Sequence, residues 1–230
     1  MKRIQSKDLE TIVYDGLPNA PITGVRWPPP NAHKPDWQNS EQNRIAQGII
    51  QRFAKLDTAS AQAAANESLS SSGRAHAIAA ERAGAVQAVS DARSKAIERA
   101  RRNAAERANL HALPTLDPGD AVGAIRDREI RDGIASLTDI QKQQLRTAMN
   151  AGKADHALHA LLRDPLADVH ASPEVEFAKN VWNDRIKAQK GEALATLEAD
   201  DSLNEWLGAV ASGHQSVLDR ADTKSGGSTA

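Results

Sequence analysis

The pattern of apolar and polar positions between residues 41 and 110 predicts helix almost throughout. Alanines and mixed charges fill this tract, proline is absent from it, and glycine occurs only at positions 48, 73 and 84. The serine-rich stretch 68–73 is its weakest part. We therefore expect either one long helix with a kink there or a pair of helices. The first half has one apolar face at helical spacing, made by Ile45, Ile49, Phe53 and Leu56.

Beyond residue 73 the apolar and alanine positions recur every 11 residues. One line of this repeat consists of Ala75, Val86, Ile97 and Ala108, and a second line three places along consists of Ile78, Val89 and Ala100. An 11-residue repeat corresponds to 3.67 residues per turn, which predicts a nearly straight or slightly right-handed packing stripe. Because the stripe is narrow and rich in alanine, a partner helix can approach closely. That partner is either the chain's own C-terminal helices or another subunit.

Residues 1–38 read as an extended, proline-rich arm. Prolines stand at positions 18, 21, 28, 29, 30 and 35, and short β-like patches occur at 11–14 and 22–25. Trp27 and Trp37 flank the run Pro28–Pro30, which predicts polyproline II structure. Two interpretations stay open. The arm folds back on its own helices, or it docks on a neighbouring subunit with the two tryptophans as anchors.

A boundary at residues 114–119 separates the long tract from a series of short, capped helices. Helix starts are predicted at Asp120, at the Thr138–Gln141 capping box, at Asp155, at Ser172–Pro173, and at Asp200 or Asp201. The expected fold is therefore all-α. Its parts are a docking arm (1–38), a long Ala-rich helical tract (39–113), a small helical bundle (114–222) and a flexible Gly/Ser tail (223–230).

Composition narrows the choice of function. Aromatic residues make up 3% and charged residues 26% of the chain. Large apolar side chains are scarce, so we expect an elongated protein or one whose stability depends on partners. The net charge of -1 argues against general binding to polyanions. Cysteine is absent, which excludes disulfides and thiolate chemistry, and no segment approaches the roughly 18 apolar residues that a membrane span needs.

The chain lacks the motifs of common active sites, namely GxxxxGK[ST], GxGxxG and GxSxG. His156 and His159 are three apart on a predicted helix, but no further histidine at useful spacing supports a metal site. We therefore predict no catalytic, cofactor-binding or metal-binding residues, no cofactor, and no enzymatic activity.

A basic stretch in the long tract offers a nucleic-acid alternative. It consists of Arg93, Lys95, Arg99, Arg101 and Arg102. Such residues could contact phosphates along DNA or RNA. Asp91, Glu98 and Glu106 dilute the stretch, and no aromatic residue is interleaved for base stacking. A solvated or subunit-facing helix is the favoured interpretation.

A resemblance appears between residues 129 and 165. The pattern comprises Glu129-Ile130-Arg131, Ile134, Leu137, Leu145, Ala148, Gly152, Ala157-Leu158, Ala160-Leu161-Leu162 and Pro165. It resembles small uncharacterised all-helical proteins encoded by tailed bacteriophages of proteobacteria. The resemblance implies a phage-encoded protein and assigns no site residue.

Together these features predict a non-enzymatic structural component of a tailed-phage particle, in the capsid, neck or tail. It would be made in the host cytoplasm and located in the virion, with other copies of itself and other virion proteins as partners. The expected partner-binding residues are Trp27, Trp37, Ala75, Val86 and Ile97. Two alternatives remain, a helical nucleic-acid-binding or regulatory protein and a phage scaffolding or assembly protein.

Overall fold

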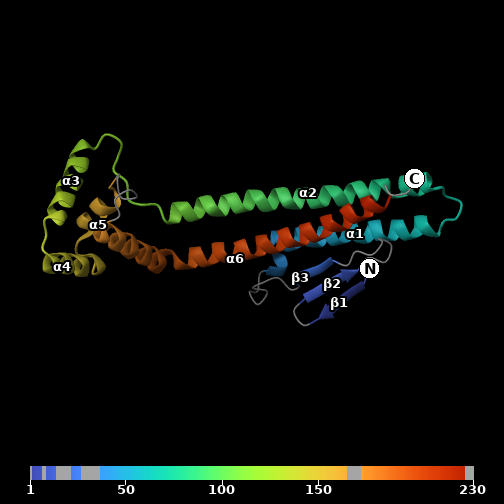
Figure 1. The fold of residues 1–230 in the computed structure, drawn as a ribbon, viewed down its shortest axis with the longest axis horizontal. Coiled ribbons are helices and arrows are strands. Elements are labelled where there is room, and N and C mark those ends of the chain that lie inside the picture. The colour runs from blue at the N-terminus through green and yellow to red at the C-terminus, as the bar shows by residue number, and fades with distance from the viewer. Residues whose placement is uncertain (1, 7–8, 14–21, 27–36, 165–171, 226–230) are drawn as a thin grey trace. The chain divides into compact units, whose positions relative to one another are not determined.

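Helices dominate the structure, as the sequence predicts. The computed structural model describes residues 2–6, 9–13, 22–26, 37–164 and 172–225 (Figure 1). The helices in this part of the chain are α1 (Glu41–Ala65), α2 (Ser71–Leu110), α3 (Ala121–Ala135), α4 (Asp139–Asn150), α5 (Asp155–Leu162) and α6 (Pro173–Ser225), and a short 3-10 turn, η1, spans Trp37–Asn39. No helix in the described part is both long enough and apolar enough to cross a membrane.

The chain folds into two compact units. Unit 1 comprises residues 1–104 and 196–230, and unit 2 comprises residues 105–195. The sequence predicts a single bundle over 114–222. In the structure, however, the last part of that range packs with the long Ala-rich helices of unit 1.

The long Ala-rich tract is a pair of helices, α1 and α2. Ser40 begins α1 as its N-cap, because its side-chain oxygen accepts a hydrogen bond from the Asn43 backbone N–H. The connection at 66–70 overlaps the predicted weak stretch. Its serines favour turns over helix, and Ser68 donates its hydroxyl to Asn66 there. The predicted break in the tract is thus confirmed.

The core of unit 1 lies between α1, α2 and the C-terminal part of α6. Figure 1 shows these three segments running side by side. The predicted apolar face of α1 packs into this core, with Phe53 fully enclosed and Ile45 partly buried at its edge. The buried side chains of this core are Ile12, Ala46, Ile49, Ile50, Phe53, Leu56, Ala85, Val89, Ala92, Trp206, Leu207, Val210, Ala211, Val217 and Leu218.

The predicted helix start at Asp200 or Asp201 is wrong. Both residues lie inside α6. The backbone leaves helical geometry ten residues earlier, at Lys190 (φ -125°, ψ 17°). Gly191 follows directly, and glycine is a poor helix former. The two carboxylates therefore do not cap a helix.

The C-terminal tail predicted from residue 223 begins as helix, because α6 ends at Ser225. The rest of the predicted tail lies outside the described residues.

Three short strands form an antiparallel meander in the segment expected to be an arm. They are β1 (Lys2–Ser6), β2 (Leu9–Val13) and β3 (Ile22–Arg26), in the order β1-β2-β3. Both β-like patches of the sequence overlap β2 and β3. Ile12 of β2 is buried in the core of unit 1, so this part of the segment folds back on its own helices. The run Pro28–Pro30 and Trp27 lie outside the described residues.

Unit 2 has a smaller core of its own. Its buried residues are Ile134, Met149, Leu158, Leu161, Leu162, Val175, Ala178 and Val181. Buried Asp127 is paired with Arg163, whose Nε lies 2.9 Å from Asp127 Oδ2. The predicted caps at Asp120 and Thr138 are confirmed. The apolar side chains of α3 are only partly buried, since Ile134 is buried but Val122 and Ile125 are exposed.

Candidate assembly surface on helix α2

The two 11-residue lines of α2 face opposite environments. Val89 is fully buried in the core of unit 1, and Ile78 packs against that core. Val86 and Ile97 are instead 44% and 56% exposed. Three residues advance an α-helix by about 300°, so the two lines differ by roughly 60° around the axis. Intramolecular packing thus occupies Ile78 and Val89 of one line, whose Ala100 is exposed, and leaves the line of Val86 open.

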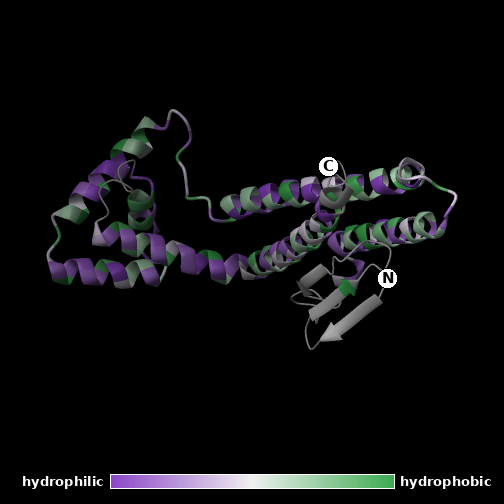
Figure 2. Ribbon diagram, turned by 45° about the vertical axis from the view of Figure 1, so that its right-hand side comes forward, coloured by the Kyte–Doolittle hydropathy of each residue, from purple (hydrophilic) through white to green (hydrophobic). Residues whose placement is uncertain are grey.

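The open line belongs to a wider uncharged surface, which we call the outer stripe. It consists of Ala75, Ala79, Ala83, Val86, Ser90, Ser94 and Ile97, all of which are exposed. The spacing of four, four and three residues is the 11-residue repeat again. Figure 2 shows apolar residues recurring along α2. Ala75, Val86 and Ile97 were predicted as partner-binding residues from the 11-residue repeat. The four residues between them were not predicted, although the same spacing of four, four and three residues leads to them.

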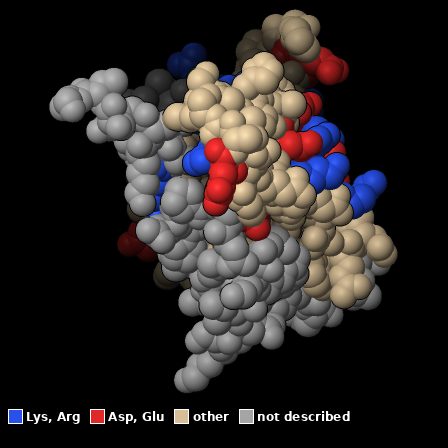
Figure 3. Space-filling model, turned by 90° about the vertical axis from the view of Figure 1, so that its right-hand side faces the viewer, with Lys and Arg blue, Asp and Glu red and all other residues tan. Residues whose placement is uncertain are grey.

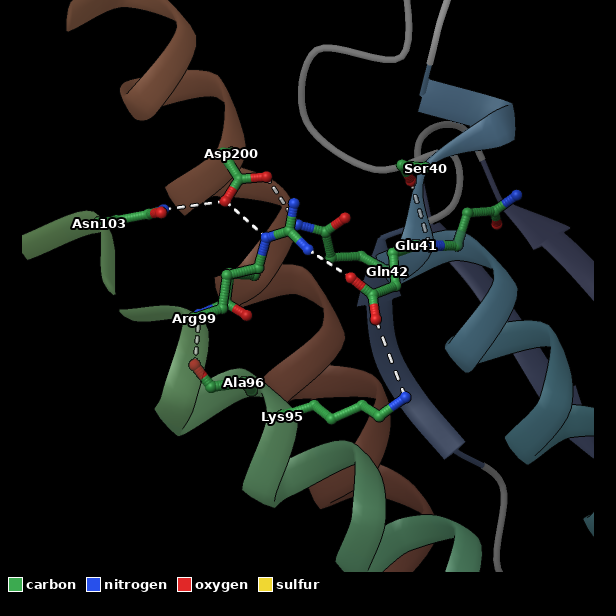
Figure 4. A network of polar contacts seen from close by, with 10 residues as sticks. Ser40, Glu41, Gln42, Lys95, Ala96, Arg99, Asn103 and Asp200 are labelled. Carbon is green, nitrogen blue, oxygen red and sulfur yellow. Dashed lines mark hydrogen bonds and ion pairs between the residues drawn. The ribbon is translucent and has the colours of Figure 1, made fainter. Parts of the chain in front are cut away.

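A polar cluster ties α2 to its neighbours on the inner side (Figure 4). Arg99 is its centre, with Nε 2.7 Å from Asp200 Oδ2 and Nη1 2.7 Å from Glu41 Oε2. Asp200 also accepts hydrogen bonds from Gln42 Nε2 at 2.8 Å and from Asn103 Nδ2 at 2.9 Å. The cluster therefore joins α1, α2 and α6 through side chains far apart in the sequence.

The charges in this cluster stabilise one another. Burial opposes ionisation of Asp200, but hydrogen bonds from Arg99, Asn103 and Gln42 outweigh it and hold its pKa below the ordinary value. The hydrogen bond to Asp200 raises the pKa of Arg99, with partial burial acting against it. Both side chains are thus ionised at neutral pH and act as a structural ion pair.

Removing the Asp200 carboxylate should weaken unit 1. We expect Asp200→Ala to lower the free energy of unfolding by roughly 2 kcal/mol, because it removes the acceptor of the buried Gln42 amide and one of the two acceptors that Arg99 and Asn103 each have. Urea denaturation followed by circular dichroism at pH 7 measures this. The matched control is Glu198→Ala on an exposed position of the same helix, for which a change within about 0.5 kcal/mol is expected. Equal effects of the two substitutions would contradict a structural role for the cluster.

The predicted basic stretch is divided between different faces of α2. Arg99 belongs to the polar cluster, and Nζ of the exposed Lys95 side chain lies 3.8 Å from Glu41 Oε1. Arg93, Arg101 and Arg102 are exposed. Lys95, Arg99 and Arg102 are spaced i, i+4 and i+7 and so share one face of α2, where Lys95 and Arg99 lie beside Glu41 and Asp200. Arg93 and Arg101 lie on another face of the helix. In the face drawn in Figure 3, basic and acidic side chains likewise lie close together.

The other residues singled out in the sequence have separate surroundings. Trp37 is half-buried in η1, directly before α1. His159 packs edge-on against Trp182, with ring centroids 6.1 Å apart, and burial lowers its pKa. Within the described ranges, no group of three or more histidine or carboxylate side chains is placed to hold a metal ion.

Comparisons with protein-family models, with curated proteins and with solved structures find no match for this chain.

Proposed function

We propose that this protein is a non-enzymatic structural component of a larger assembly, in which α2 packs against a helix of another subunit through the outer stripe. The observation that carries the proposal is the exposure of Val86 and Ile97 on an uncharged helix face. Alanine on an exposed face is explained by helix propensity alone, but valine and isoleucine are not, because β-branched side chains lose rotamer freedom in a helix.

The surroundings of the stripe support a protein partner over a nucleic acid. Seven consecutive stripe positions between 75 and 97 carry no charge, in a chain of which 26% is charged. A phosphate-binding surface needs several cations on one face. Three basic residues of α2 share a face, but acidic side chains offset their charge there, since Arg99 is held by Asp200 and Glu41 and Lys95 lies beside Glu41.

The resemblance of residues 129–165 to tailed-phage proteins suggests a virion as the assembly. In this proposal the partners are other copies of the chain and other virion proteins, and Trp27 and Trp37 add anchors at the N-terminal segment. Mass spectrometry of purified particles tests the location. Absence of this chain from particles of the phage that encodes it would remove the virion from the proposal.

Substitutions on the stripe test the assembly itself. We expect Val86→Asp and Ile97→Asp to abolish self-association while leaving the helical circular dichroism unchanged, because each places a charge in the contact but none in the core. Size-exclusion chromatography with light scattering measures the mass across a concentration series. Wild-type protein that stays monomeric throughout, or aspartate variants that associate like wild type, would contradict the proposal.

Val89→Asp is the matched control. It introduces the same aspartate one turn further along α2, at a fully buried position. A buried, unpaired carboxylate is strongly destabilising, so this variant should lose stability, whereas Val86→Asp should retain it. The pair separates loss of association from loss of folding.

A further inference from the structure

We infer that two copies of this chain pair along the outer stripe in parallel and in register, so that each stripe residue faces its own copy. This inference rests on the proposed function and specifies the partner of the same surface. It is carried by the charges that border the stripe, together with the small residues within it.

The two borders of the stripe differ in charge, because one carries two arginines and the other a neutral glutamine and a glutamate. Arg82 and Arg93, eleven residues apart, run along one border. Gln87 and Glu98, also eleven apart, run along the other. An 11-residue repeat turns the helix by about 98° per residue. At this angle, each border lies about 33° around the helix axis beyond the nearer edge of the stripe. Arg93 and Glu98 are exposed, and neither forms an ion pair with a described residue of its own chain.

Pairing direction decides which borders meet. In a parallel two-fold pair, each border faces the opposite border of the partner helix, in the manner of the flanking positions of parallel coiled coils. Arg93 of one copy then approaches Glu98 of the other, five residues further along, and the symmetry makes two such pairs. In an antiparallel pair each border faces itself, which brings the arginines of the two copies together. Charge complementarity therefore favours the parallel arrangement.

The composition of the stripe fits close approach of two identical helices. Five of its seven residues are alanine or serine, so the backbones can come nearer than with large side chains. A serine hydroxyl inside the contact can bond to a backbone carbonyl one turn earlier in its own helix, which leaves no unpaired group. The stripe extends from Ala75 to Ile97, which is about 33 Å along the helix. Exposed Arg101 is the next residue in the repeat and would face its own copy, so we place the end of the contact at Ile97.

Cysteines introduced one at a time distinguish parallel from antiparallel pairing, because the natural chain contains no cysteine. We expect Ala79→Cys and Ser94→Cys each to form a disulfide-linked dimer under mild oxidation with oxidised glutathione. Ala80→Cys, on an exposed neighbouring position outside the stripe, serves as the control and should remain largely monomeric. Equally efficient cross-linking of all three variants would overturn the inference, because it would show no preference for the stripe.

A mixture of the two variants gives the decisive result. Positions 79 and 94 are about 22 Å apart along the helix, so in parallel, in-register pairs a tagged Ala79→Cys chain should not cross-link to an untagged Ser94→Cys chain. In antiparallel pairs centred near Val86, the mixed 79–94 product should dominate. That product would overturn the parallel pairing and leave the proposed assembly function standing. If the wild-type chain does not associate at all, both the parallel pairing and the proposed assembly function are contradicted.

Charge reversal provides an independent measurement. We expect Arg93→Glu alone and Glu98→Arg alone each to raise the dimer Kd roughly threefold to tenfold, since each creates two like-charge contacts. The double variant Arg93→Glu/Glu98→Arg should return the Kd to near the wild-type value in sedimentation equilibrium at low salt. A double variant as weak as the single variants would overturn the proposed pairing of these two residues.

Discussion

Acidification from pH 7 to pH 4 is expected to lower the free energy of unfolding by about 3 kcal/mol through His214 alone. This side chain is fully buried in unit 1, and burial lowers its pKa from 6.5 to about 4, against the effect of its hydrogen bond to Val210. His214 Nδ1 lies 2.8 Å from the Val210 carbonyl oxygen, so the neutral ring donates its proton there. The folded protein thus holds a neutral imidazole that the unfolded chain would protonate.

The sign of the pH effect follows from the lowered pKa. Stability from the neutral ring is fully present above the unfolded pKa of 6.5 and is lost as the pH falls toward 4. About 2 kcal/mol of the loss should occur between pH 7 and pH 5, before most carboxylates titrate. Urea denaturation at several pH values measures it. In His214→Leu this part of the pH dependence should disappear, and an unchanged slope in that variant would show that another group is responsible.

Phe53→Ala should be among the most destabilising single substitutions in unit 1, with an expected loss of about 4 kcal/mol. Phe53 is fully buried in the middle of the apolar face of α1. Its ring meets the His214 ring edge-on, with centroids 4.6 Å apart and planes at 74°. Truncation leaves a cavity beside the imidazole. The same variant should therefore raise the pKa of His214 toward its ordinary value and weaken the pH dependence described above.

Two control variants make the result specific. Phe53→Leu retains most of the apolar volume, and we expect it to lose less than half as much stability as Phe53→Ala. Lys55→Ala, on an exposed position of the same helix, should change the free energy of unfolding by less than about 0.5 kcal/mol. A loss of under about 1 kcal/mol for Phe53→Ala would mean that this part of the core is not closely packed around the ring.

Local signals in the sequence were sufficient for most of the helices. The caps at Ser40, Asp120 and Thr138 are short-range hydrogen bonds between a side chain and a backbone N–H three residues on, so a window of four residues contains the whole interaction. The serine-rich break between α1 and α2 and the apolar face around Phe53 are equally local. The three-stranded meander was not predicted as a sheet, because strand pairing joins residues such as Lys2 and Val13 across intervening chain.

The exposure of the outer stripe on α2 could not be predicted from neighbouring residues alone. The sequence by itself determined that α2 carries two parallel lines with an 11-residue period, since periodicity depends on spacing alone. Which line faces inward depends on α1 and on the part of α6 around Leu207 and Val210, more than 100 residues away in the chain. Arg99 and Asp200 are also more than 100 residues apart in the chain, and the sequence pattern predicted a helix start at Asp200. Only the tertiary structure brings these residues together, buries Val89 and leaves Val86 and Ile97 for a partner.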